Sequence, residues 1–235
     1  MSTSLRRQLN FFASIAESSS RYEDMIDYIK RIVELESELD LIERNYLSTA
    51  YQNAIYQRRT ALYIFNDLYL KETSIKGSQK LKTIESYKSI IESELKRFCY
   101  EIIHLIDKIL LPQSKNEENT VFYYKMKGDY YRYLTEFLEG EDRLKSADHS
   151  LASYNHGLKL ASKKLDHSNS IKLGLCLNFS VFYHEILGDD KGACRMAQDA
   201  YNLALSSLDN LSEDEYKESL SVMEILKDNL SIWEK

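Results

Sequence analysis

VFYYKMKGDYYRYL, residues Val121 to Leu134, is the most informative stretch of this sequence. It places Arg132 directly beside Tyr133 in an acidic chain whose net charge is −6. A guanidinium donates two parallel hydrogen bonds to a phosphate, and a neighbouring phenol adds a third. A second basic pair, Arg58–Arg59, stands upstream in the helical stretch from Tyr46 to Arg59. Two basic clusters on two helices predict a binding site for one phosphate dianion.

The composition around this stretch predicts an all-α protein. Only 7 glycines and 1 proline occur among 235 residues, which favours long helices over the turns of a β-protein. Hydrophobic residues make up 43 % of the chain, enough to form a sizeable core. Tyrosines at helical spacing usually pack their rings in such a core. Because there are 18 of them, no single tyrosine marks a binding site by itself.

Charge and cysteine content restrict the partners and the compartment. Acidic residues outnumber basic ones by 37 to 31, so general nucleic-acid binding is not expected. Cys99, Cys176 and Cys194 lack metal-ligand spacing, which indicates reduced thiols in a cytoplasmic protein, with the nucleus as an alternative compartment. The N-terminal residues have the pattern of an amphipathic helix rather than a signal peptide. No apolar run is long enough to span a membrane, so no membrane partner is expected.

The hydrophobic periodicity predicts nine helices joined by short links. Their expected ranges are about 4–18, 21–35, 40–70, 78–111, 120–139, 142–165, 171–188, 190–208 and 212–233. Short links favour antiparallel neighbours. Neither a linker of low complexity nor a repeat of about 34 residues divides the chain, which favours a single domain over residues 1–235.

Turn and capping residues set the expected helix ends. Pro112 is expected to end the fourth helix, since proline cannot continue one, and residues 113–119 are expected to form a loop. Gly140 is expected to cap the fifth helix in a left-handed conformation. Ser212 and Glu215 have the spacing of a capping box at the start of the ninth helix.

The motifs of catalysis and of cofactor binding are missing from the sequence. The glycines are scattered and form no phosphate-cradling loop, and the five histidines show no metal-ligand spacing. The carboxylates are distributed as on solvated helical faces rather than as a buried acid–base pair. We therefore expect no enzyme activity, no metal and no cofactor.

Four helical faces combine polar and apolar residues. Residues seven apart on a helix differ by about −20° in direction and so share a face. The four faces carry Gln52 and Arg59; Lys125 and Arg132; Gly174, Leu177, Asn178, Val181 and Glu185; and Ile225, Asn229, Ile232 and Trp233. Each face by itself also has an ordinary explanation, as a solvated surface or as part of the core.

The chain resembles the 14-3-3 family. VFYYKMKGDYYRYL and LGLCLNFSVFYHEIL (Leu173 to Leu187) are similar to the two signature stretches of that family. RYEDM (Arg21 to Met25), ERNYLSTAYQN (Glu43 to Asn53) and DNLSIW (Asp228 to Trp233) add further matches. The likeness runs in the same order over nearly the whole chain, and these motifs are long and specific.

The resemblance implies a single 14-3-3-like domain of nine antiparallel helices, which forms a cup-shaped, dimeric protomer. Each protomer would hold an extended phosphoserine or phosphothreonine peptide of a client protein in an amphipathic groove. The implied phosphate ligands are Arg59, Arg132 and Tyr133, with Lys125 and Gln52 nearby. Asn178 and Asn229 would bond the peptide backbone, and Asp129 and Glu185 would be polar supports. The implied groove wall is Gly174, Leu177, Val181, Ile225, Ile232 and Trp233.

Two departures from the family pattern concern phosphate binding and the dimer. Gln52 stands where the family usually has a lysine, which predicts phosphate binding weaker by about 5–30-fold. The implied dimer interface carries Arg21, Asp24, Tyr87, Ile90 and Glu94. Arg21 and Glu94 would pair across it, whereas Asp24 would lose its basic partner because Ile90 replaces a common lysine. A homodimer is still expected, with heterodimers of paralogues as an alternative.

Two functional hypotheses remain open beside the minor one of an enzyme. The first is an adaptor that clamps phosphorylated client proteins and changes their activity, interactions or location. The second is a helical interaction scaffold of the same fold with weakened or lost phosphate dependence, which the uncharged Gln52 keeps open.

Overall fold

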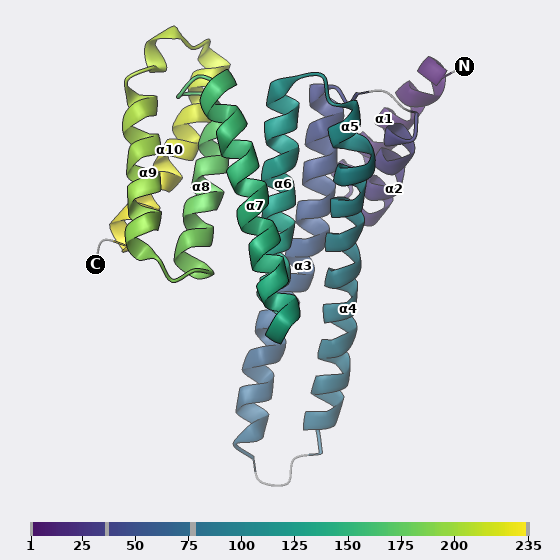
Figure 1. Ribbon diagram of the computed structural model, residues 1–235. Helices are drawn as coiled ribbons and strands as arrows, with labels where there is room; N and C mark the ends of the chain where they lie inside the picture. The colour runs from purple at the N-terminus through teal and green to yellow at the C-terminus, as the bar shows by residue number, and fades with distance from the viewer. Residues whose placement is uncertain (1, 36–37, 76–78, 234–235) are drawn as a thin grey trace. The chain divides into compact units, whose positions relative to one another are not determined.

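The computed structural model describes residues 2–35, 38–75 and 79–233, and within these ranges the chain is helical without any β-strand (Figure 1). If the unbroken helix α4–η1–α5 is counted as one, the described ranges contain nine helices. The all-α prediction is confirmed. The chain forms two compact units, residues 1–113 and 114–235. The single domain stays a prediction.

The first unit contains α1 to α5. The helices are α1 (Ser2–Ser18), α2 (Tyr22–Val33), α3 (Leu41–Thr73) and α4 (Leu81–Leu105), which continues through the π-helical turn η1 (Ile106–Leu110) into α5 (Leu111–Gln113). A capping box begins α3: Asp40 accepts a hydrogen bond from the backbone N–H of Glu43, and Glu43 accepts one from that of Asp40. In this unit α2 packs against α1 and α3, and α3 packs against α4.

Glu43 joins two of these helices through its buried carboxylate. Arg6 of α1 donates to it from Nε at 2.7 Å and also from Nη2, and Asn10 donates at 2.8 Å. Burial raises the pKa of Glu43, but these donors and the positive charge of Arg6 outweigh burial and hold that pKa below its usual value. The ion pair therefore fixes α1 against the start of α3.

The second unit contains α6 to α10. The helices are α6 (Glu117–Thr135), α7 (Gly140–Lys164), α8 (Ser170–Glu185), α9 (Asp190–Leu205) and α10 (Glu213–Trp233), with a 3-10 turn η2 (Leu208–Asn210) before the last. Asn116, Asn169 and Asp189 cap α6, α8 and α9 by accepting backbone hydrogen bonds. The predicted capping box of Ser212 and Glu215 is confirmed at the start of α10.

The core of the second unit depends on close approach of α6 to α7. A Cβ added to Gly128 would lie 2.6 Å from the ring of Tyr154, so only glycine fits there. That ring stacks on Phe179 of α8 at 5.1 Å between centroids. Nearer the start of α8, Leu173 packs with Met223 and Leu226 of α10. Helix α8 therefore lies in contact with α6, α7, α9 and α10.

Some predicted helix ends are wrong. The fourth helix passes Pro112 and ends at Gln113, and the π-helical turn just before it provides the wider backbone that a proline ring needs. Helix α6 begins at Glu117 instead of at 120, because Asn116 caps it. The start of the fourth helix at Ser78 lies outside the described residues.

Gly140 has the expected left-handed conformation, but it lies at the start of a helix rather than at the end of one. Its φ is +56°, but it is the first residue of α7, and α6 already ends at Thr135. Arg143 donates to the carbonyl of Thr135 at 3.2 Å, which satisfies an acceptor that the end of α6 leaves open. Within residues 2–35, 38–75 and 79–233, no helix has both the length and the apolar character needed to cross a membrane.

Candidate functional site

Asp129 of α6 is the centre of a polar network in the second unit. The residue is only 3 % exposed. Its Oδ1 accepts hydrogen bonds from the Asn178 amide at 2.7 Å and from the Tyr154 hydroxyl at 2.6 Å. Its Oδ2 accepts one from Lys125 at 2.9 Å. The carboxylate thus fixes one side chain from each of α6, α7 and α8 in a defined position.

Arg132 lies one turn after Asp129 on α6. Its side chain is buried, with 7 % of the residue exposed. Its Nη1 donates a hydrogen bond to Glu185 of α8 at 3.2 Å and lies 3.8 Å from the carboxylate of Glu136. Its guanidinium carbon lies 4.8 Å from the ring centre of Tyr133, a cation–π contact. Its Nε is buried and has no hydrogen-bond partner in the described part of the chain. A buried donor without a partner is unfavourable, so a hydrogen-bond acceptor that reached it would stabilise this arrangement.

The charge of Arg132 is preserved by its neighbours. Burial lowers its pKa, but the nearby Tyr154, Tyr133 and Asp129 outweigh burial and raise it above the ordinary value. The guanidinium is therefore a permanent cation at a position with little access to water. Such a cation interacts more strongly with an anion than one in bulk solvent does.

Lys125 shares its face of α6 with Arg132, as the spacing predicts. Its ammonium is largely buried and bonded to Asp129. A Cβ added to Gly174 of α8 would lie 3.5 Å from Cε of Lys125, so the lysine side chain passes directly over that glycine. The structure thus brings together Lys125, Asp129, Gly174 and Asn178.

The other predicted residues of this unit lie along α8 and α10, which pack together. Leu177 and Val181 are half-buried on α8, and Asn229 is half-buried on α10. Ile225 and Ile232 are 47 % and 62 % exposed. Trp233 packs against the buried cluster between α8 and α10, and its ring lies 5.1 Å from that of His184. Ile225 and Ile232 therefore leave apolar surface exposed on the helix that carries the half-buried Asn229.

The phosphate-binding residues predicted for the first unit lie on α3. Gln52 is exposed and Arg59 is half-buried, and they share one helical face. Arg58, the other half of the basic pair, is engaged within its own unit. It donates to Glu94 at 2.7 Å and to Glu23 at 2.6 Å, and it lies 4.5 Å from the ring centre of Phe98. Arg58 is therefore a structural residue of the first unit, whereas Arg59 is the member of the pair that is predicted to bind phosphate.

Sequence reasoning missed Tyr154. It is completely buried, yet its hydroxyl supports Asp129 from a different helix. No spacing rule links residues 129 and 154, because only the packing of α7 on α6 brings them together. Its position beside Gly128 was the one available signal, since a glycine within a helix indicates close approach of another element.

The model of the 14-3-3 protein family matches residues 12–234 of this chain. This protein belongs to the 14-3-3 family. It is 44 % identical to the 14-3-3-like protein GF14 omicron of Arabidopsis thaliana over 223 residues, which cover 95 % of this chain and 88 % of that protein. It is 44 % identical to the checkpoint signal transducer rad24 of Schizosaccharomyces pombe over 233 residues, 99 % of this chain and 86 % of that protein. It is 43 % identical to the 14-3-3-like protein C of Glycine max over 232 residues, 99 % of this chain and 90 % of that protein.

As a 14-3-3 protein, the chain is an adaptor rather than an enzyme, and phosphopeptide binding is the general role of its family. The five residues predicted for the 14-3-3 dimer interface all lie in the first unit. Tyr87 and Ile90 are exposed on α4, at 52 % and 51 %. The side-chain pairings predicted across that interface stay predictions, and the structure adds two pairings within the chain.

Within the chain, Arg21 donates to Asp24 at 2.5 Å from three residues away. Glu94 accepts a hydrogen bond from Arg58 of its own chain at 2.7 Å. Each of these two carboxylates therefore has a guanidinium of the same unit as a partner. Tyr87 and Ile90 contribute exposed apolar surface to the predicted interface of this 14-3-3 chain.

Proposed function

We propose that this protein is an adaptor that binds phosphoserine or phosphothreonine segments of client proteins and thereby alters their activity, interactions or location. The observation that carries this proposal is the buried Arg132, held by Glu185 with one donor unused, beside the network of Asp129. A cation kept in place by neighbouring carboxylates needs little reorganisation when it binds a phosphate.

The phosphate is bound by Arg132, Tyr133 and Lys125 of α6. A phosphate monoester carries close to two negative charges at neutral pH and offers three strong acceptor oxygens. Each charge-assisted hydrogen bond contributes roughly 1.5–3 kcal/mol. The family resemblance adds Arg59 and Gln52 of α3 to this set, and Gln52 contributes a donor without a charge.

The asparagines bind the peptide main chain. Asn178 donates one amide hydrogen to Asp129, so its carbonyl and second amide hydrogen remain for the peptide. Asn229 of α10 has the same capacity. Because an amide side chain both donates and accepts, it binds main-chain groups without requiring particular client side chains. Leu177, Val181, Ile225, Ile232 and Trp233 provide the apolar wall along α8 and α10.

A binding titration with one peptide, phosphorylated or not, tests the proposal. We expect the phosphorylated form to bind much more tightly by fluorescence anisotropy. Arg132→Ala and Arg59→Ala should each weaken binding, by more than about tenfold, because each removes charged donors. Lys163→Ala is the matched control, since Lys163 is an exposed cation on α7. Equal binding of the two peptide forms by the wild-type chain would overturn the proposal.

The exposed, neutral Gln52 favours a second candidate, a scaffold that binds clients without needing their phosphate. In that case the unphosphorylated peptide binds comparably and Arg132→Ala has little effect. The same titration therefore separates the two functions.

We further propose that the two compact units form one functional domain, that the protein acts in the cytoplasm as a homodimer, and that it can pair with paralogues. Exposed Tyr87 and Ile90 on α4 and the family resemblance support the dimer.

A further inference from the structure

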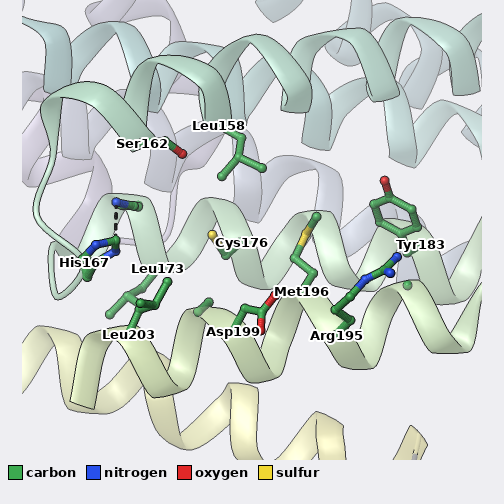
Figure 2. Close-up of a pocket in the computed structure, with 13 residues that line it drawn as sticks. Leu158, Ser162, His167, Leu173, Cys176, Tyr183, Arg195, Met196, Asp199 and Leu203 are labelled. Atoms are coloured by element: carbon green, nitrogen blue, oxygen red, sulfur yellow. Dashed lines mark hydrogen bonds between the residues drawn. The ribbon is translucent and has the colours of Figure 1, made fainter. Parts of the chain in front are cut away.

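A separate cavity lies between α7, α8 and α9 of the second unit (Figure 2). Its volume is about 260 Å³. That volume is enough for roughly nine atoms of the size of a water oxygen. None of the residues assigned above to peptide binding lines it. Whatever this cavity holds is therefore independent of the proposed phosphopeptide function.

Most of the cavity wall is apolar. Leu158 of α7, Leu173 and Cys176 of α8, and Met196, Ala200 and Leu203 of α9 contribute to it. In Figure 2, Cys176 and Met196 face the space between the ends of the cavity, with Leu158 opposite them. A wall of this kind binds aliphatic chains, because burial of apolar surface drives their transfer from water.

One end of the cavity carries a buried cation. Lys172 is only 7 % exposed. Its ammonium donates to the carbonyl of Leu165 at 3.0 Å and lies 3.4 Å from Nδ1 of His167. It has no carboxylate partner within the described ranges. An ammonium has three donors, so capping the end of α7 uses only part of its capacity.

Burial lowers the pKa of Lys172, only partly opposed by Cys176 and Asp166. Removing a charge from water without a counter-ion is unfavourable, and a bound anion would offset that cost. The apolar surroundings of the thiol likewise raise the pKa of Cys176 to about 11, so this side chain is neutral.

The opposite end has no comparable preference for an anion. Tyr183 and Arg195 lie there together in Figure 2. Arg195 is exposed to solvent, and so is Asp199, which lies one turn further along α9, between Met196 and Leu203 in Figure 2. Their opposite charges offset each other, and solvent screens both. An anionic head group is therefore favoured at the Lys172 end, with its tail along Leu158 and Met196.

We propose that this cavity is a binding site for a small aliphatic monocarboxylate, whose head group contacts Lys172 and whose chain fills the space between α7, α8 and α9. A carboxylate fits better than a phosphate, because only one buried cation faces a mainly apolar wall. Octanoate has about the size that the cavity volume allows.

Methionine methyl NMR on the full chain tests the site. Met196 lines the cavity, whereas Met25 lies buried in α2 of the other unit. With methyl-labelled methionine, octanoate should shift the Met196 signal saturably and leave the Met25 signal in place. The Met196 signal is assigned with the variant Met196→Leu. A Met196 signal that does not move with octanoate overturns the proposal.

Comparing a charged ligand with a neutral ligand of similar length tests recognition of the head group. In the wild-type protein, octanoate should bind roughly ten- to a hundredfold more tightly than 1-octanol, the neutral ligand of similar length. Lys172→Met should remove that preference, whereas Lys163→Met, at an exposed site on α7, should keep it. Equal affinity of octanoate and octanol in the wild type overturns the proposal, and this comparison stands even where Lys172→Met fails to fold.

Discussion

The amide of Asn178 donates a 2.7 Å hydrogen bond to Asp129, which lies 49 residues earlier on another helix. The same carboxylate holds Lys125 and Tyr154. One buried carboxylate therefore orients both a proposed phosphate ligand and a proposed backbone ligand. Its loss should affect peptide binding without removing any residue that touches the peptide.

Asp129→Asn tests that indirect role. A neutral amide has one acceptor oxygen in place of two, and its NH2 group would face either Lys125 or the pair Asn178 and Tyr154, all of which are donors here. We expect the free energy of unfolding to fall by about 1–3 kcal/mol and phosphopeptide affinity to fall by about 5–50-fold. Asp148→Asn, at an exposed site on α7, is the control for both measurements. Unchanged peptide affinity in a folded Asp129→Asn variant would contradict the positioning role.

Gln52→Lys should strengthen phosphopeptide binding. The substitution adds a cation to an exposed face of α3 shared with Arg59, and we expect a gain of about 5–30-fold in affinity. Gln57→Lys adds the same charge at another exposed position of that helix and should give a much smaller change. If both variants bind alike, the gain reflects overall charge rather than a contact with phosphate.

Gly128→Ala should destabilise the protein. Its new Cβ would lie 2.6 Å from the buried ring of Tyr154, and overpacking of this kind costs about 1–3 kcal/mol. Gly174→Ala meets only an ordinary contact at 3.5 Å, and alanine in a helix is favoured over glycine by about 0.5–1 kcal/mol. Urea unfolding followed by circular dichroism should therefore give opposite signs for the two variants.

The ionisation of Glu43 should make the free energy of unfolding depend on pH in the acidic range. Because its folded pKa lies below the ordinary value, its stabilising effect is fully present above about pH 4.3 and is lost as the pH falls through the folded pKa. Glu43→Gln should lower the free energy of unfolding by about 1–3 kcal/mol near neutral pH and flatten its decline in acid. Glu34→Gln, at an exposed site, should preserve the wild-type pH profile. A wild-type profile in Glu43→Gln would contradict this account.

The chain should be a dimer at micromolar concentration by light scattering. Ile90→Glu places a charge on the exposed apolar surface of α4, and we expect it to shift the mass toward the monomer. Leu144→Glu introduces the same charge at an exposed position of α7 and should leave the mass unaltered. A monomeric wild type would rule out the proposed dimer.

Interactions between residues close together in the sequence explain most of the features that could be predicted. The scarcity of glycine and proline, the apolar periodicity and the capping box at Ser212 and Glu215 each act within a few residues, so the sequence alone indicates the helices. The shared faces of Lys125 with Arg132 and of Leu177 with Val181 follow in the same way from helix geometry. Helix ends were less predictable where a distant side chain decides them, as Arg143 does by bonding the carbonyl of Thr135.

The sequence by itself determined the helical class, the order of the helices and the family to which the chain belongs, because these depend on local propensity and on long contiguous motifs. Only the tertiary structure decided which charges are bonded and which remain available. Arg58 lies between Glu23 and Glu94, Tyr154 reaches Asp129 from α7, and Lys172 is buried at the end of a cavity. Hydrogen bonding and burial depend on residues that packing brings together from distant parts of the chain. The spacing of residues along one helix does not predict such contacts.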